Sequence, residues 1–566
     1  MKQSSTGSRL LQGAFVLGFA AIISKIIGAF QKIPLQNLGG DGVFGIYNTV
    51  YPFYMLLITI AAAGLPVAVS KFVAEQNAMG RPEEGRRIVR LSSMLLGGIG
   101  LVLALLMYIG APFIGDLIGN GSVVSSIRAA SMALLFVPVM TGLRGYFQGL
   151  QQMVPTAVSQ VVEQMVRVTV MIVLLLWLMG RNASMETIAA GAMLGSVAGG
   201  IAGLVAMLGY MYRHRRKNRE QFTVKKDADT AEQMQKTKER RSVGSSLLPE
   251  ERRSNSEWIR TLLIYAIPVC LGSLAVPLMN LVDTFTVPRL LRQEGLDELQ
   301  SMVSFGIYNR GLPLVQLVTM LATSLSVLFI PAMAEARLKG GPEAVRKQAG
   351  LALRWFWLIG LAASAGLAVL AEPINRMLYG DAAGTEALRY MALMAAGSTV
   401  SIIAAALLQG LGAVRAPAFS MLAAAGVKAL LNVMLVPALG ISGAALAGAV
   451  AYMLAAGLNV ALLARLTAMR PAPGAVLAKP ALVIAAMCLA AAGTAWAAEA
   501  ALGGIGFAAE GRLAAVGVSL LGVAAGSAVF VLAAALTGLL TAAELAAVPK
   551  LGPLLAKLLR RLRVLR

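Results

Sequence analysis

The sequence predicts an all-α integral membrane protein with about 14 transmembrane helices, in two six-helix halves and two extra C-terminal helices. Of its 566 residues, 58% are hydrophobic and 13% are charged, whereas about 45–50% apolar residues are usual in soluble domains. Apolar stretches of about 20 residues, enough to cross a bilayer as a helix, follow one another along the chain. A motif near the start of the second apolar stretch also recurs in the second half. Alternating strand patterns, which would indicate a membrane barrel, are missing.

Windows of about 19 residues locate the spans. The fourteen predicted spans are 10–33, 45–70, 90–114, 126–149, 155–179, 186–211, 258–287, 303–333, 350–371, 386–409, 416–438, 441–464, 476–497 and 513–540. The first is expected to be an uncleaved helix, because Lys2 and Arg9 precede its apolar run and no small-residue cleavage site follows.

The distribution of charge predicts the orientation. Loops after even-numbered spans carry most of the basic residues: Lys71, Arg81, Arg86, Arg87, Arg90, Arg337, Lys339, Arg346, Lys347, Arg415, Arg465 and Arg470. Loops after odd-numbered spans carry acids: Asp41, Asp116, Glu186, Glu294, Asp297, Glu298, Asp381, Glu386 and Glu499. Basic loops face the cytoplasm. We therefore expect a multi-pass protein of the cell membrane with both termini inside. The net charge of +22 then reflects orientation rather than nucleic-acid binding.

The chain divides at a basic segment. We expect a six-helix half at 1–211, a basic cytoplasmic linker at 212–257, a second six-helix half at 258–465 and two additional transmembrane helices at 466–541. A basic amphipathic tail at 542–566 is expected to lie on anionic lipids.

An internal repeat supports this division. Phe-Gly-Ile-Tyr-Asn occurs at 44–48 and again at 305–309, each followed at the same offset by a proline, Pro52 and Pro313. A weaker echo pairs Gln-Gly-Leu at 148–150 with 409–411. Both echoes run in the same direction in equivalent spans, which predicts halves related by a pseudo-two-fold axis along the membrane normal.

Several functions are excluded by missing residues. The single histidine, His214, lies in a basic loop, which excludes Ser-His-Asp catalysis and histidine metal sites. Cys270 and Cys488 lie in apolar segments without metal-binding spacing. No GxxxxGK[ST] phosphate loop occurs, so there is no Walker-type ATP site. We expect neither an enzyme nor a cofactor or metal, and a coupling ion is left open. A duplicated bundle without a nucleotide site instead favours alternating access.

Charged residues inside spans usually face a partner or a wet cavity, so they are candidates for substrate binding. The predicted substrate-binding residues are Lys25, Lys32, Arg310, Asp283 and Asn280. Lys25 and Lys32 are seven residues apart and share one helical face. A site with more basic than acidic groups suits an anion such as phosphate. Two alternatives remain: Lys32 extends to the membrane interface, or Asp283 and Arg310 form a pair that only joins helices.

A second polar cluster is expected at the cytoplasmic ends of the fourth and fifth spans. Its members, predicted to gate the inner mouth or to bind sugar hydroxyls, are Arg144, Gln148, Gln160, Glu163, Gln164 and Arg167. An intrahelical ion pair between Glu163 and Arg167 is the alternative, because the two residues are four apart. Lys428, midway along the eleventh span, has no assigned role.

Three segments carry a family resemblance. They are Arg-Gly-Tyr-Phe-Gln-Gly at 144–149 with its continuation to Gln164, Ser-Lys-Ile-Ile-Gly at 24–28, and Gly-Leu-Pro-Val-Ala-Val-Ser-Lys-Phe at 64–72. These resemble the polysaccharide-transport branch of the multidrug/oligosaccharidyl-lipid/polysaccharide (MOP) exporter superfamily, above all MurJ-type lipid II flippases and the stage V sporulation protein B group. Family members often have Arg where this chain has Lys25, which keeps the charge but not the bidentate geometry. Arg310 matches a functional arginine of the MurJ type.

The resemblance implies a flippase that moves an undecaprenyl-pyrophosphate-linked saccharide, such as lipid II, to the outer leaflet through a cationic central cavity. The last two spans would line a groove for the lipid tail, and a monomer is expected. The competing interpretation is a cation-coupled multidrug exporter of the same superfamily, whose site would be net negative. A glycan polymerase is a third and more distant possibility, because it would need large outward loops with carboxylates. The sequence does not choose among peptidoglycan, spore-cortex and other envelope precursors.

Overall fold

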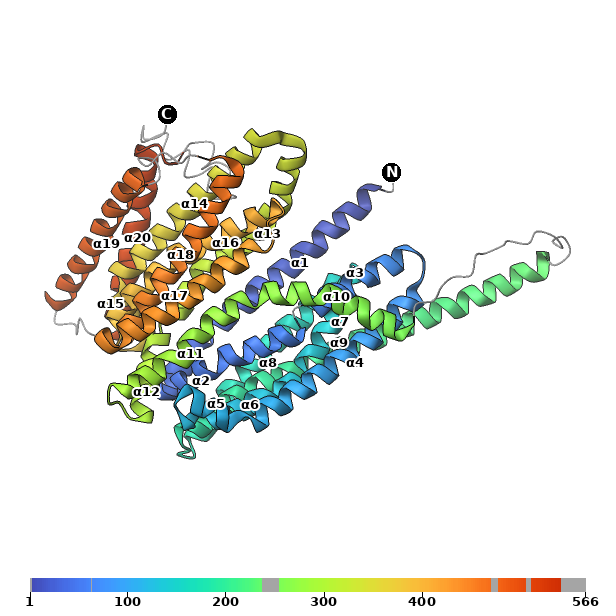
Figure 1. Ribbon diagram of the computed structural model, residues 1–566, viewed down its shortest axis with the longest axis horizontal. Coiled ribbons are helices and arrows are strands. Elements are labelled where there is room, and N and C mark those ends of the chain that lie inside the picture. Colours follow the sequence, from blue (N-terminus) through green and yellow to red (C-terminus); the bar gives the residue numbers. More distant parts are fainter. Residues whose placement is uncertain (1–2, 63, 237–253, 470–476, 505–510, 541–566) are drawn as a thin grey trace.

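The computed structural model in Figure 1 describes residues 3–62, 64–236, 254–469, 477–504 and 511–540. These residues form helices joined by short turns, and the described part of the chain contains no β-strand. The predicted all-α fold is therefore confirmed. The tail at 542–566 lies outside the described residues.

The first half of the chain consists of α1 to α9. Their bounds are α1 Gln3–Phe30, α2 Lys32–Ala62, α3 Leu65–Ala78, α4 Pro82–Ile109, α5 Ala111–Ile118, α6 Val124–Ser131, α7 Val137–Gly149, α8 Met153–Met179 and α9 Met185–Lys236. Prolines in the first turns of α3, α4, α5 and α7 suit helix starts, where a backbone N–H has no partner. α2 changes direction at Gly40, whose φ of 75° lies in the region that glycine tolerates best.

The second half and the C-terminal pair follow. Their bounds are α10 Asn255–Ser273, α11 Ala275–Gln293, α12 Glu298–Asn309, α13 Leu312–Glu335, α14 Gly341–Val369, α15 Ala371–Tyr379, α16 Thr385–Gly410, α17 Ala416–Leu439, α18 Ile441–Thr467, α19 Lys479–Gly504 and α20 Arg512–Leu536. α10 and α12 begin with capping boxes at Ser254 and Asp297, which satisfy N-terminal backbone donors. The predicted linker at 212–257 is helical up to Lys236, because α9 continues into it.

Eleven ranges of the described chain are long and apolar enough to cross a membrane, or twelve if the bent pair α10–α11 is one span. Two of these ranges, 16–78 and 298–369, contain 63 and 72 residues. A single bilayer crossing needs only about 20 residues. The protein is thus a multi-pass membrane protein, and the count of 14 stays a prediction.

The two copies of the repeated motif cross where the halves approach most closely. A Cβ atom on Gly45 would collide with the backbone oxygen of Met302, and one on Gly306 would collide with the backbone oxygen of Asp41. Each glycine thus faces the residue four positions before the other glycine. Reciprocal contacts of this kind are what a two-fold axis between the motifs requires. The motif recurs because both helices need a glycine at this crossing.

α10 of the second half packs on α3 and α4 of the first half, and the halves also meet at one end of the molecule through α2. We call this end the Arg310 end, and the opposite end, from which α9 extends, the linker end. At the Arg310 end α2 packs against α11, α12 and α15, as Figure 1 shows at lower left. Away from it, α1 contacts both α8 of the first half and α13 of the second. α1 therefore lies between the halves.

The C-terminal pair lies on the outer flank of the second half. α19 and α20 pack on each other and against α14 and α15, in red beside yellow in Figure 1. Leu370 and Ile374 contribute to the apolar contact, together with Ala491 and Val518. The additional helices are therefore connected to the second half.

The glycine crossing yields a first prediction. Gly306→Ala places a methyl group against the backbone of Asp41, so the helices must separate, at a cost of about 1–3 kcal/mol. Thermal unfolding of the purified protein is expected several degrees lower. Gly98→Ala in α4 is the matched control, because nothing lies within 4 Å of its Cβ position. If Gly306→Ala and Gly98→Ala unfolded at the same temperature, the close backbone contact at Gly306 would be contradicted.

Candidate functional site

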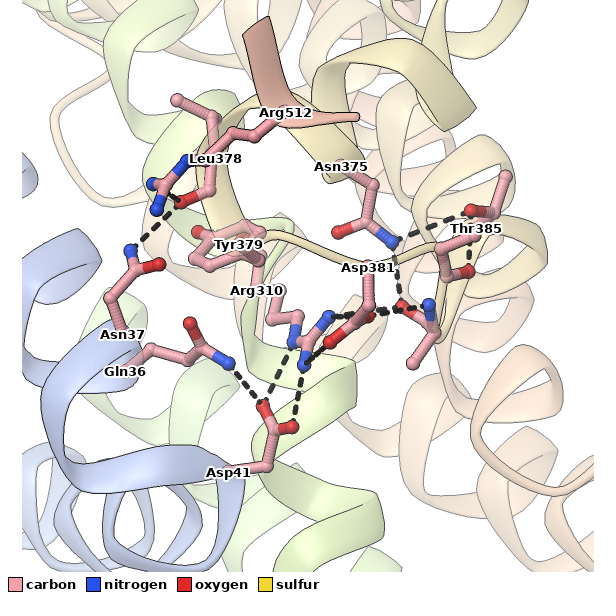
Figure 2. Close-up of polar contacts among 12 residues, drawn as sticks. Gln36, Asn37, Asp41, Arg310, Asn375, Leu378, Tyr379, Asp381, Thr385 and Arg512 are labelled. Carbon is pink, nitrogen blue, oxygen red and sulfur yellow. Dashed lines mark hydrogen bonds and ion pairs between the residues drawn. The ribbon is translucent and has the colours of Figure 1, made fainter. Parts of the chain in front are cut away.

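Arg310, in the two-residue turn between α12 and α13, joins the halves through two carboxylates. Its Nε and Nη2 atoms donate to the two oxygens of Asp41, at 2.8 and 2.5 Å. Its Nη1 and Nη2 atoms donate to Asp381, at 2.6 and 3.1 Å. Asp41 belongs to the first half and Asp381 to the second. We call these three residues the Arg310 closure, and Figure 2 shows the guanidinium between its two acids.

Burial makes this closure strong. The Arg310 side chain is 2% exposed, that of Asp41 is 16% exposed and that of Asp381 is 52% exposed. An arginine fork can bind carboxylates through paired hydrogen bonds, which a lysine cannot do. Gln36 donates to Asp41 at 3.1 Å, which holds this carboxylate in place. Separation of the halves at this end therefore requires that Arg310 leaves Asp41.

The loop that contains Asp381 is held in place by hydrogen bonds to its neighbours. Tyr379 donates to the backbone oxygen of Arg310 at 2.7 Å, and Asn375 donates to that of Ala383 at 2.6 Å. Burial disfavours the charged form of Asp381, but hydrogen bonds from Arg310 and the Ala383 N–H outweigh it and hold the pKa of Asp381 below its usual value. The carboxylate is thus ionised at neutral pH, and its contribution to closure disappears only as the pH falls through that lowered pKa.

Asp283 has different partners from those considered in the sequence. It accepts hydrogen bonds from Lys428 at 2.6 Å, Tyr308 at 2.7 Å and Asn432 at 3.1 Å. This group lies entirely within the second half, on α11, α12 and α17. The alternative of an Asp283–Arg310 pair is therefore wrong. Asn280, one turn away on α11, is exposed.

The polar cluster of the fourth and fifth spans lies further from the cytoplasmic ends of the helices than the predicted position at the inner mouth. Glu163 accepts from Arg144 at 2.9 Å and from Arg167 at 2.6 Å, and Arg144 also donates to Ser159 at 2.9 Å. Glu163 is ten residues from Met153, the start of α8, or about 15 Å along the helix. The intrahelical Glu163–Arg167 pair is thus present. We call these four residues the Glu163 cluster.

The cluster is packed against its neighbours. Gly195 and Gly199 of α9 bring this helix against the backbone of α8 at Arg167 and Glu163. Gly203, four residues further along α9, faces the Met140 sulfur and the Glu163 Cβ atom. Gln164 donates to Gln31 at 3.3 Å and thereby connects α8 to the chain just before Lys32. Gln148 and Gln160 are half-buried, and their side chains form no hydrogen bond to another described residue.

Lys25 and Lys32 differ from the other basic residues of the candidate site. Lys32 is 5% exposed, and its ammonium lies 5.8 Å from the centre of the Tyr51 ring. Lys25 is exposed. Among the described residues, no carboxylate forms an ion pair with either lysine. Both belong to the stretch between the halves, and seven residues of helix separate them by about 10 Å.

The structure thus divides the predicted site into separate groups. Arg310 belongs to the closure, Asp283 to a pair within the second half, and the Glu163 cluster to the first half beside the two lysines. Sequence reasoning missed the partners Asp41 and Asp381, which it treated as loop acids, and Lys428, to which it gave no role. The only signal for Asp41 was its position one turn before the repeated motif.

The fold is that of a multi-pass membrane protein whose two halves are joined through a buried arginine and its carboxylates. The chain matches the model of the family described as "Polysaccharide biosynthesis protein" over residues 10–337 and belongs to this family. It lies in the polysaccharide-transport branch of the MOP superfamily, whose members are transporters or flippases rather than enzymes.

Individual comparisons agree. The chain is 33% identical over 449 residues to the uncharacterized membrane protein YabM of Bacillus subtilis (strain 168), covering 79% of both chains. It is 28% identical over 462 residues to the lipid II flippase MurJ of the same organism, covering 79% of this chain and 81% of that one. A solved structure of the lipid II flippase MurJ in an inward closed conformation has the same fold, with a TM-score of 0.61, 13% identity and coverage of 92% and 98%.

The closure yields a second prediction. Asp41→Asn removes the carboxylate that joins Arg310 to the first half, at an expected cost of about 3 kcal/mol. The fraction of molecules that are open at the Arg310 end should rise about a hundredfold. Spin labels on cysteines at Ser184 and Glu386, exposed residues of the two halves at this end, measure the distance in a background without Cys270 and Cys488.

Asp116→Asn is the matched control, since Asp116 is an exposed acid at the same end, outside the closure. The control is expected to keep the distance distribution of the parent protein. If Asp41→Asn also kept it, Arg310 would not hold this end closed.

Proposed function

We propose that the protein is a flippase for an undecaprenyl-pyrophosphate-linked saccharide, lipid II or a related cell-envelope precursor. The observation that carries the proposal is the pair Lys25 and Lys32. Both lie on the segment between the halves, and neither has a carboxylate partner among the described residues. Lys32 is buried, and a buried ammonium without an acid is costly in a membrane unless an anion can take the place of the acid. Lys25 is exposed on the neighbouring helix.

The balance of charge favours an anionic substrate. The two lysines and the Glu163 cluster together contain four basic side chains and one carboxylate. The acids Asp41, Asp381 and Asp283 are all paired with Arg310 or Lys428 and are not available to a cationic drug. A pyrophosphate would supply the negative charge that no carboxylate of the described chain supplies to the two lysines. This balance favours a flippase over a cation-coupled multidrug exporter.

The relatives support a lipid-linked substrate. Membership of the polysaccharide family and similarity to a lipid II flippase both point to a saccharide on a lipid carrier. We place the linker end in the cytoplasm by the positive-inside rule, so both termini are cytoplasmic in this proposal. With the Arg310 end closed, the substrate enters from the inner leaflet. Opening of the closure then releases it to the outer leaflet.

In this proposal, Lys25 and Lys32 hold the pyrophosphate, and the Gln31–Gln164 pair beside them can bind sugar hydroxyls. Arg310 and Asp283 are paired in this conformation, so we assign them to closure and to internal structure. The protein works as a monomer, its basic tail contacts anionic lipids, and no cofactor is needed. A membrane potential, an ion gradient or consumption of the product can drive turnover.

A third prediction tests the lysines. Lys32→Ala removes a charge-assisted contact worth about 1.5–3 kcal/mol, so transport should fall about 10- to 100-fold. Lys25→Ala is expected to act in the same direction, whereas Lys32→Arg keeps the charge and should keep most of the activity. The assay depletes the resident lipid II flippase of a Gram-positive host, expresses the variant and measures accessible lipid II at the outer leaflet.

Lys347→Ala is the control, because Lys347 is exposed on α14 near the linker end. Full rescue by inserted Lys25→Ala and Lys32→Ala variants would reject the lysine site. Failure by the inserted parent protein would indicate another lipid-linked saccharide or the drug exporter. Thiol reagents separate these two outcomes. Faster labelling of cysteines introduced next to Lys25 and Lys32 by cationic than by anionic reagents would support the drug exporter.

A further inference from the structure

The first residue of α20 contacts the loop next to the Arg310 closure. Arg512 donates from Nε to the backbone oxygen of Met377 at 2.9 Å and from Nη2 to that of Leu378 at 2.8 Å. Both carbonyls belong to the last turn of α15, just before the loop that carries Asp381. Figure 2 shows Arg512 reaching this turn from the C-terminal pair.

The Leu378 carbonyl is also a contact to the first half. Asn37, shortly before the bend of α2 at Gly40, donates to the same oxygen at 2.8 Å. One backbone oxygen thus accepts hydrogen bonds from Arg512 of the C-terminal pair and Asn37 of the first half. This shared oxygen is a further link between the halves, next to the closure.

The chemistry of the contact explains why an arginine is there. The last carbonyls of a helix have no partner within the helix, and they form its negative end. Arg512 supplies two donors in a fixed planar geometry, so it can satisfy neighbouring carbonyls at once. α20 also packs along α15, which limits the movement of this turn relative to the C-terminal pair.

We propose that Arg512 is a positioning residue for closure of the transporter at the Arg310 end. It fixes the last turn of α15, so that Leu378 meets Asn37 and Asp381 meets Arg310. The C-terminal helices thereby stabilise the state closed at this end. The inference rests on the proposed transport cycle for its consequence, but the contact itself does not depend on the substrate.

Spin-label distances between Ser184 and Glu386, measured in the full chain without substrate, test this. Arg512→Ala is expected to increase the population open at the Arg310 end about tenfold, as loss of two hydrogen bonds predicts. Arg512→Lys keeps one donor group and should give a smaller increase. Lys479→Ala is the control, because Lys479 lies on α19 and donates to the Thr537 oxygen within the C-terminal segment.

A double-mutant cycle separates positioning from a general effect on stability. Because Arg512 and Asn37 act through the same oxygen, Asn37→Ala should add little in the Arg512→Ala background. An unchanged distance distribution in Arg512→Ala, or full additivity with Asn37→Ala, would overturn the proposal. If Arg512→Ala does not fold, the cycle is measured with Arg512→Lys in its place. An unchanged distance distribution, or full additivity with Asn37→Ala, would again overturn the proposal.

If the flippase assay failed but Arg512→Ala increased the population open at the Arg310 end, the proposed substrate would be rejected and the positioning role of Arg512 would be retained. An active flippase whose distances do not respond to Arg512→Ala would reject only the positioning role.

Discussion

A basic side chain buried in a membrane protein needs an acid, and in this chain the position of each acid decides what the basic residue does. Arg310 has two carboxylates, one from each half, so it closes one end of the molecule. Lys428 has Asp283 within a single half, so it connects helices of that half. Arg144 and Arg167 share Glu163. Lys25 and Lys32, on the segment between the halves, form no ion pair with a carboxylate in the part of the chain that the structure describes.

These pairings fit a transporter whose halves move relative to each other. In the proposed cycle, pairs inside a half persist throughout, whereas those across the Arg310 end break when that end opens. The crossing at Gly45 and Gly306 lies next to this link, because Gly306 faces the backbone of Asp41, the acid that joins Arg310 to the first half. Contacts through Leu378 extend the link to Asn37 and to the C-terminal pair.

The sequence predicts those features that depend on residues near one another in the chain. Span positions follow from apolar runs, the repeat from the motif itself, and the Glu163–Arg167 pair from helical spacing. It does not predict the partners of Arg310, because Asp41 and Asp381 are 269 and 71 residues away. Both acids resemble ordinary loop residues until the helices are placed. The Asp283–Arg310 alternative failed for the same reason: opposite charges in neighbouring spans do not show which face each helix presents.

The central claim is that the unpaired lysines bind a lipid pyrophosphate. The most direct measurement is equilibrium binding of undecaprenyl pyrophosphate to the purified full-length protein, compared with a hydrophobic cation and with undecaprenol. The account predicts that the pyrophosphate lipid binds at least about tenfold more tightly than either, with the preference lost in the Lys25→Ala/Lys32→Ala double variant. Tighter binding of the hydrophobic cation, or an unchanged preference in the double variant, would contradict it.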